Sequence, residues 1–139
     1  MCVLRATGKD FDPETFLRAS SLEPCRVFRR GEPRIPASRK VARRSEVSGF
    51  TVVVSDAPWT DLPGQVEDAE GFLQSNRSEI ERLASCPGVT DLVLDFPLGV
   101  RMDDDSAFPR FDRFPAAFVR LAGELGIALE LSTYPVSGE

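Results

Sequence analysis

Histidine is absent from this chain of 139 residues, and that absence excludes more functions than any other feature of the sequence. Without histidine there is no Ser–His–Asp or Cys–His catalysis and no zinc site ligated by imidazole. Acid–base catalysis would have to use carboxylates, lysine, tyrosine, cysteine or arginine. The sequence therefore favours a non-enzymatic binding protein, and it predicts no cofactor and no metal site.

Cysteines and long apolar runs are also scarce. Three cysteines, Cys2, Cys25 and Cys86, form no C-x-x-C pair and leave an odd thiol, which indicates reduced cysteines in the cytoplasm. No apolar stretch approaches the roughly 20 residues that cross a membrane. The first residues, Met-Cys-Val-Leu-Arg, lack the pattern of a signal peptide. We therefore expect a cytoplasmic protein with no membrane partner.

What the chain does contain is typical of one globular domain. Its apolar fraction of 42% and charged fraction of 28% are ordinary, and its length suits a single domain over 1–139. A net charge of −5 gives no general attraction to nucleic acid, which we expect to be an unfavourable partner. The three residues Asp103–Asp105 lack the alternating spacing of a calcium loop, so a polar turn is the expected structure there.

Hydrophobic periodicity predicts an alternation of strands and helices. The expected strands cover 2–7, 25–28, 49–55, 90–96 and 127–134, and the expected helices cover 13–20, 66–84 and 115–125. Gly71 and a polar gap weaken the middle of the longest helix, so two shorter helices remain an alternative. The pattern predicts an α+β fold: a single domain with an antiparallel or mixed sheet of four to five strands and about three helices mainly on one face.

The end of the chain gives the clearest local signal. Pro115 begins a helical pattern and Gly126 ends it, which is the usual asymmetry of helix termini. The following strand alternates, so Ile127, Leu129 and Leu131 are expected to face the core. Residues 97–113 are expected to form a long connection before this helix.

A basic loop at 29–47 differs in composition from the rest of the chain. Between positions 26 and 44 there are eight basic residues and one acid, Glu32, which gives a net charge of +7. Prolines 33 and 36 disfavour a helix in its first half. This loop is either a solvated surface or a binding segment for an acidic protein, and nucleic acid is a weaker alternative.

A protein partner is the leading hypothesis. Trp59 is included among the expected contacts because tryptophan often dominates protein interfaces. A short edge strand over 25–28 also leaves a homodimer open. The residues expected to contact a partner are Arg29, Arg30, Arg39, Arg43, Arg44 and Trp59.

The second hypothesis is a hydrolase that uses carboxylates and a phenol on the uncovered face of the sheet. If alternate residues of two strands face the helices, the polar residues between them share the other face. Paired carboxylates can perform acid–base chemistry without histidine, although cross-strand charge pairing on a wet face is the simpler interpretation. The weak catalytic candidates are Asp91, Asp95, Glu130 and Tyr134, with Arg5 joining them if the register of the first strand allows.

Four short motifs along the chain resemble a bacterial family of domains of unknown function. They are Gly8-x-x-x-Asp12-Pro-Glu14, Leu22-Glu-Pro24, Gly31-Glu32 and the terminal Leu121-x-x-Glu-Leu-Gly-Ile-x-Leu-x-Leu-x-x-Tyr134. The resemblance implies a small cytoplasmic α+β domain, and it implies no catalytic residues. By analogy with other small bacterial domains, it also suggests a binding role of the toxin-immunity kind.

Overall fold

A mixed sheet forms the centre of the molecule, and the computed structural model describes it within residues 1–33, 45–101 and 111–136. Five strands and four helices lie in these described ranges. The strands are β1 (Cys2–Gly8), β2 (Arg26–Phe28), β3 (Ser48–Ser55), β4 (Asp91–Arg101) and β5 (Ala128–Val136). The helices are α1 (Pro13–Arg18), α2 (Leu62–Ser75), α3 (Arg77–Ala84) and α4 (Ala116–Glu124).

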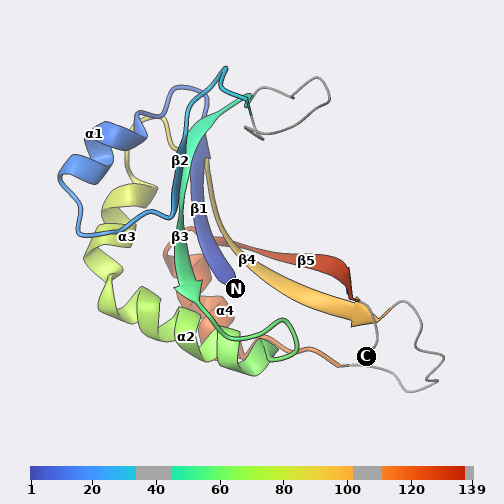
Figure 1. Ribbon diagram of the computed structural model, residues 1–139. Coiled ribbons are helices and arrows are strands. Elements are labelled where there is room, and N and C mark those ends of the chain that lie inside the picture. Colours follow the sequence, from blue (N-terminus) through green and yellow to red (C-terminus); the bar gives the residue numbers. More distant parts are fainter. Residues whose placement is uncertain (34–44, 102–110, 137–139) are drawn as a thin grey trace.

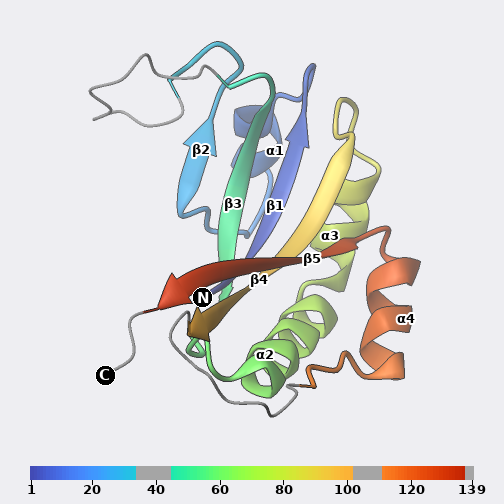
Figure 2. The same ribbon diagram turned by 90° about the vertical axis from the view of Figure 1, so that its right-hand side faces the viewer.

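The strands lie in the order β2-β3-β1-β4-β5. Strand β1 is antiparallel to both β3 and β4, whereas β5 returns parallel to β4 after the crossover through α4. The helices gather on one side of the sheet (Figure 1), and the sheet twists so strongly that β5 runs across the direction of β2 and β3 (Figure 2). The predicted α+β class, the mixed sheet and the one-sided helical layer are confirmed.

The predicted long helix is two helices, which is why four helices are found instead of about three. The break lies at Asn76, where the backbone leaves the helical conformation with φ −116° and ψ 22°. The Asn76 side-chain amide donates to the Phe72 carbonyl oxygen at 2.9 Å, which competes with continuation of the helix. Asparagine therefore ends α2 and begins α3 at the polar gap that the sequence contains.

The core lies between the helices and one face of the sheet. Leu4, Phe50 and Phe96 project from the sheet and are fully buried. Phe96 packs edge-on against the rings of Phe114 and Phe118, with centroid distances of 5.1 and 5.9 Å. Burial of these large side chains is the main stabilising contribution of this face.

The expected loop over 97–113 is wrong at its beginning, because β4 continues through Pro97 to Arg101. The pairing of β4 with β1 stops at Asp95, which lies opposite Val3 near the beginning of β1, so beyond Asp95 β4 has a strand neighbour only in β5. The Pro97 carbonyl accepts a hydrogen bond from the Gln65 side chain at 3.2 Å, on the side where no strand pairs. The missing N–H of proline therefore costs no ladder bond.

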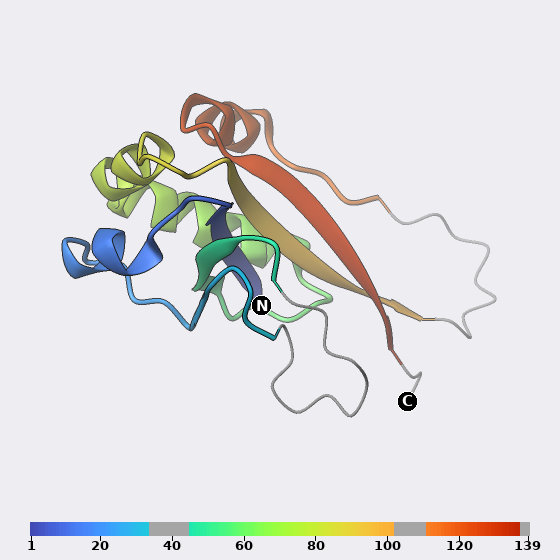
Figure 3. The same ribbon diagram turned by 90° about the horizontal axis from the view of Figure 1, so that it is seen from above.

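The expected burial of Leu131 is also wrong, although Ile127 is buried and Leu129 is half-buried as predicted. Leu131 lies on the helix-facing side opposite Phe96, yet 49% of it is exposed. Phe96 and Leu98 of the neighbouring strand β4 are buried, whereas Leu131 belongs to the edge strand β5, so the helical cover is incomplete at this edge. Figure 3 shows β4 and β5 extending past the helices. Periodicity predicts which face of the sheet a side chain occupies, but it does not predict how far the helices extend over that face.

Candidate functional site

The face of the sheet opposite the helices is open and polar. The strand register places alternate residues of neighbouring strands together on this face. Asp91 and Asp95 of β4 lie there with Glu130, Ser132 and Tyr134 of β5, and Arg5 of β1 joins them. The structure thus places the polar residues as the alternation indicated, and it settles the register of Arg5.

Two side-chain pairs connect the strands across the middle of this open face. The Arg5 guanidinium donates to a Glu130 carboxylate oxygen at 3.2 Å, and both side chains are partly exposed. The Ser132 hydroxyl donates to an Asp95 carboxylate oxygen at 2.7 Å. Each of these two carboxylates therefore forms a cross-strand contact on the solvent-exposed face of the sheet, which is a common arrangement in sheets.

The four weak catalytic candidates do not converge on one cavity. A pocket of about 710 Å³ opens on this face, and of the four only Asp91 lines it. Asp95 and Glu130 are held by Ser132 and Arg5, as above, and Tyr134 packs against a different residue, Trp59. A hydrolytic site needs its acid and base near one reacting atom. The geometry therefore supports binding better than hydrolysis.

Trp59 and Tyr134 form an exposed aromatic pair. Their rings stack with centroids 5.2 Å apart, and 39% of Trp59 and 44% of Tyr134 remain exposed. Tyr134 lies opposite Gly99 in the β4–β5 register, and the Gly99 N–H donates to the Trp59 carbonyl oxygen at 3.3 Å. Because glycine has no side chain, the tyrosine ring reaches across β4 to the tryptophan.

Gln65 of α2 holds the Trp59 loop against the sheet, a role that the sequence did not reveal. Its side-chain amide is fully buried and donates to the carbonyl oxygens of Pro58, at 3.1 Å, and Pro97, at 3.2 Å. The loop beside Trp59 is thereby connected to β4. A glutamine among the apolar residues of an amphipathic helix was the only available signal of this contact.

Three of the residues predicted to contact a partner are described, and Trp59 lies far from Arg29 and Arg30. Arg30 follows β2, and its N–H donates to the hydroxyl of Ser48, the first residue of β3, at 2.9 Å. Arg29 forms an ion pair with Glu14 of α1. Trp59 follows the other end of this strand of eight residues. The two ends are about 25 Å apart at roughly 3.3 Å per residue. Arg39, Arg43 and Arg44 lie outside the described residues.

The three cysteines are free, in agreement with the predicted reduced thiols. Burial, reinforced by the negative charge of Asp95, raises the pKa of Cys2 to about 12. Desolvation also raises the pKa of Cys86. Neither cysteine is therefore a thiolate near neutral pH, and neither suits nucleophilic catalysis.

The described residues contain neither a cluster of metal ligands nor a membrane-spanning helix. No group of three or more cysteine, aspartate and glutamate side chains there is placed to hold a metal ion. The helices in the described ranges are also too short or too polar to cross a membrane.

The whole described fold corresponds to a single family. The family model for a domain of unknown function (DUF4279) matches residues 1–136, so the chain belongs to this family. The family resemblance inferred from the short motifs is thereby confirmed at the level of a domain of unknown function. No curated protein and no solved structure matches the chain.

Proposed function

We propose that this domain is a binding protein whose partner is a protein with an exposed basic segment, and that the partner docks on the open face around Trp59 and Tyr134. The stacked aromatic pair carries this proposal. Two large rings lie half-exposed on a face that no described helix covers. Tryptophan and tyrosine are enriched among the residues that contribute most to protein–protein affinity.

The charge around the pair favours a basic partner. Asp56 and Asp61 are exposed in the loop that carries Trp59, and Asp95 lies two residues before Pro97 on the same face. Cations of a partner gain from these carboxylates and also from the faces of the two rings. A segment that contains arginine would satisfy both interactions.

The aromatic pair of Trp59 and Tyr134 is also preorganised in the unbound protein. Gln65 holds the loop of Trp59 to β4, and the stacking with Tyr134 restricts the tryptophan ring. Restricting a contact residue in advance lowers the entropy that binding must offset. The same geometry offers no shared cavity to the four hydrolase candidates, which is why we favour binding.

Binding of a synthetic peptide that alternates arginine and leucine tests this proposal. Trp59 is the only tryptophan in the chain, so its fluorescence reports contact directly. We expect a saturable change that weakens as salt is raised, and we expect no change with the matching glutamate–leucine peptide.

Two variants test the location of the contact by calorimetry. Trp59→Ala should weaken binding of the arginine–leucine peptide by about tenfold or more. Val119→Ala removes a similarly exposed apolar side chain from α4 and should leave the affinity unchanged. Absence of binding to the wild-type protein, or equal affinities of the two variants, would overturn the proposal.

A further inference from the structure

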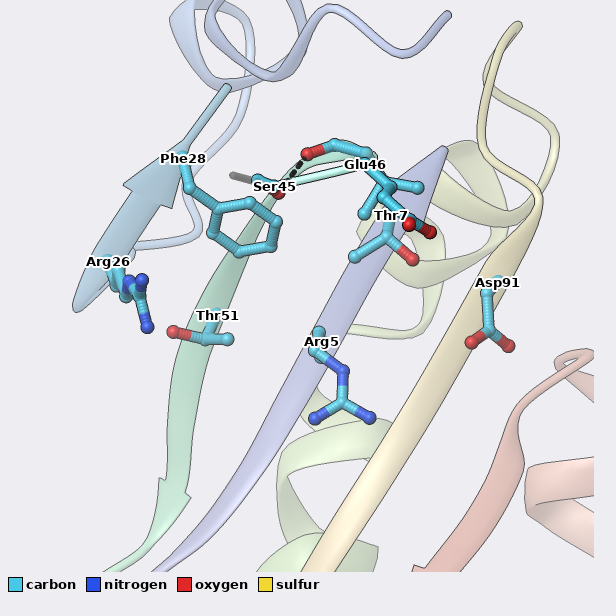
Figure 4. A pocket seen from close by; sticks show the side chains of 9 residues that line it. Arg5, Thr7, Arg26, Phe28, Ser45, Glu46, Thr51 and Asp91 are labelled. Atoms are coloured by element: carbon cyan, nitrogen blue, oxygen red, sulfur yellow. Dashed lines mark hydrogen bonds between the residues drawn. The ribbon is translucent and has the colours of Figure 1, made fainter. Parts of the chain in front are cut away.

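The pocket of about 710 Å³ lies on the same face, toward the beginning of β3 and away from Trp59. It is distinct from the aromatic pair, because neither Trp59 nor Tyr134 lines it. Strands β2, β3, β1 and β4 form its floor, and residues 45–47 form part of its wall (Figure 4). Its volume lies within the range of about 300–1,000 Å³ that is usual for small-ligand sites.

The pocket has charges of both signs in separate rows. The register aligns Arg26, Thr51 and Arg5 in one row across three strands. The next row contains Phe28, Gly49, Thr7 and Asp91. Guanidinium groups therefore flank a hydroxyl in the first row, and a carboxylate lies in the second. Figure 4 shows Arg5 between Thr51 and Asp91, with the Phe28 ring on the opposite side of the hollow.

The wall of the pocket is fixed at its base. The Gly31 N–H donates to the Ser45 carbonyl and the Ser45 N–H donates to the Glu32 carbonyl, each at 2.8 Å. These two bonds clamp the chain beside the pocket, and Glu46 follows directly and lines it. A second carboxylate is thus held near the row that contains Asp91.

The carboxylates are the groups that lack partners. Within the described ranges, no side chain forms an ion pair or hydrogen bond with the carboxylates of Asp91 or Glu46. Arg5, by contrast, already contacts Glu130 and remains accessible at the pocket. A ligand that brings an ammonium group would therefore neutralise charges that are otherwise exposed to solvent alone.

We propose that this pocket binds a short free peptide of about three residues as a zwitterion. Its carboxylate contacts the row of Arg5, Thr51 and Arg26, and its ammonium contacts Asp91 and Glu46. Thr51 and Asp91 are two strands and two residues apart, which places their Cα atoms about 12 Å from each other. An extended tripeptide spans at most about 10 Å, and the side chains make up the difference. The Phe28 ring offers an apolar surface for a central side chain.

Calorimetry with the tripeptide Ala-Phe-Ala tests the site. The wild-type protein should bind it at millimolar concentration or below. The N-acetylated and C-amidated forms should each bind about tenfold more weakly, because each lacks one charge-assisted hydrogen bond. A peptide at the end of a longer chain carries only one of these charges, so the two blocked forms separate a free peptide from a chain terminus.

A pair of variants identifies the group that contacts the ammonium. Asp91→Asn should weaken binding of the free tripeptide about tenfold, but it should weaken binding of the acetylated form much less. Glu67→Gln changes another exposed carboxylate, on α2 and outside the pocket, and should have no effect. Circular dichroism confirms that each variant is folded. The proposal is overturned if the wild-type protein does not bind Ala-Phe-Ala, or if acetylation weakens binding equally in the wild-type protein and in Asp91→Asn.

This test is independent of the proposed protein partner. Trp59→Ala should leave the affinity for Ala-Phe-Ala unchanged, because Trp59 does not line the pocket. Loss of tripeptide binding in that variant would contradict the separation of the two sites.

Discussion

The two faces of the sheet have opposite compositions although they share the same strands. The face toward the helices holds Leu4, Phe50 and Phe96, which are fully buried. The other face holds Arg5, which forms an ion pair with Glu130, and Asp95, which accepts a hydrogen bond from Ser132, and both side chains remain partly exposed. Alternation along each strand is enough to produce this division. It separates residues that stabilise the fold from residues that are available for recognition.

This separation implies that stability and binding can be altered independently. A substitution on the helix-covered face removes dispersion contacts and leaves a cavity. A substitution on the open face removes exposed contacts that water largely replaces. The largest loss of stability is therefore expected on the helix-covered face, and smaller changes are expected elsewhere.

Phe96→Ala should lower the free energy of unfolding by about 3–5 kcal/mol, because a fully buried ring is lost from the cluster with Phe114 and Phe118. Urea denaturation measures the change. Phe111→Ala is the control, since 88% of that residue is exposed and little change is expected. Similar losses in the two variants would contradict the contrast between buried and exposed rings.

Gly126→Ala should lower the free energy of unfolding by about 1–2 kcal/mol. This glycine joins α4 to β5 with φ 72°, and a Cβ there would meet no atom within 4 Å, so the cost comes from the backbone alone. Gly123→Ala within α4 also has open space and should instead stabilise by about 0.5–1 kcal/mol. Thermal unfolding of both variants shows whether each substitution raises or lowers the stability. A loss of stability in both variants would disprove the backbone explanation.

On the open face, the Arg5–Glu130 pair should contribute less than about 1 kcal/mol, because both side chains are partly exposed and solvent screens them. A double-mutant cycle with Arg5→Met and Glu130→Gln measures the coupling free energy. A coupling well above this range would show that the open face is a stabilising element, and the comparison of the two faces would fail.

The smallest effect is expected at Asp12, an exposed group on the helical side. Hydrogen bonds from the Thr15 hydroxyl, at 2.6 Å, and from its N–H, at 3.3 Å, lower the pKa of the Asp12 carboxyl. A pKa that is lower in the folded state than in the unfolded state contributes stability at pH values above the unfolded-state pKa. This contribution is lost as the pH falls through the folded-state pKa. Thr15→Val should raise the pKa of Asp12, as measured by NMR titration. An unchanged pKa would exclude the hydroxyl as its main cause.

The regular elements could be predicted because their signals are local. The strand signals of β3 and β5 and the polar gap near Asn76 depend on neighbouring residues. The continuation of β4 through Pro97 could not be predicted, because it depends on the residue at which the pairing of β4 with β1 stops. The exposure of Leu131 likewise depends on the extent of the helical layer.

The candidate sites were less predictable because they combine distant segments. Trp59 was recognised as a possible contact, but its stacking on Tyr134 requires Gly99 between them. The pocket needs Arg26, Thr51 and Arg5 in one row. The strand order that aligns them cannot be predicted from the sequence of any one strand. Polar residues can be assigned to a face from the sequence, whereas their neighbours across strands require the register.

The backbone clamp between Gly31, Glu32 and Ser45 has a consequence for the evolution and engineering of the domain. Its two hydrogen bonds join backbone atoms on either side of residues 33–44, so the clamp itself uses no side chain. Insertions there should therefore accumulate among relatives without shifting the pairing of β2 with β3. The same position offers a point at which a tag or a second domain can be introduced while the sheet is preserved.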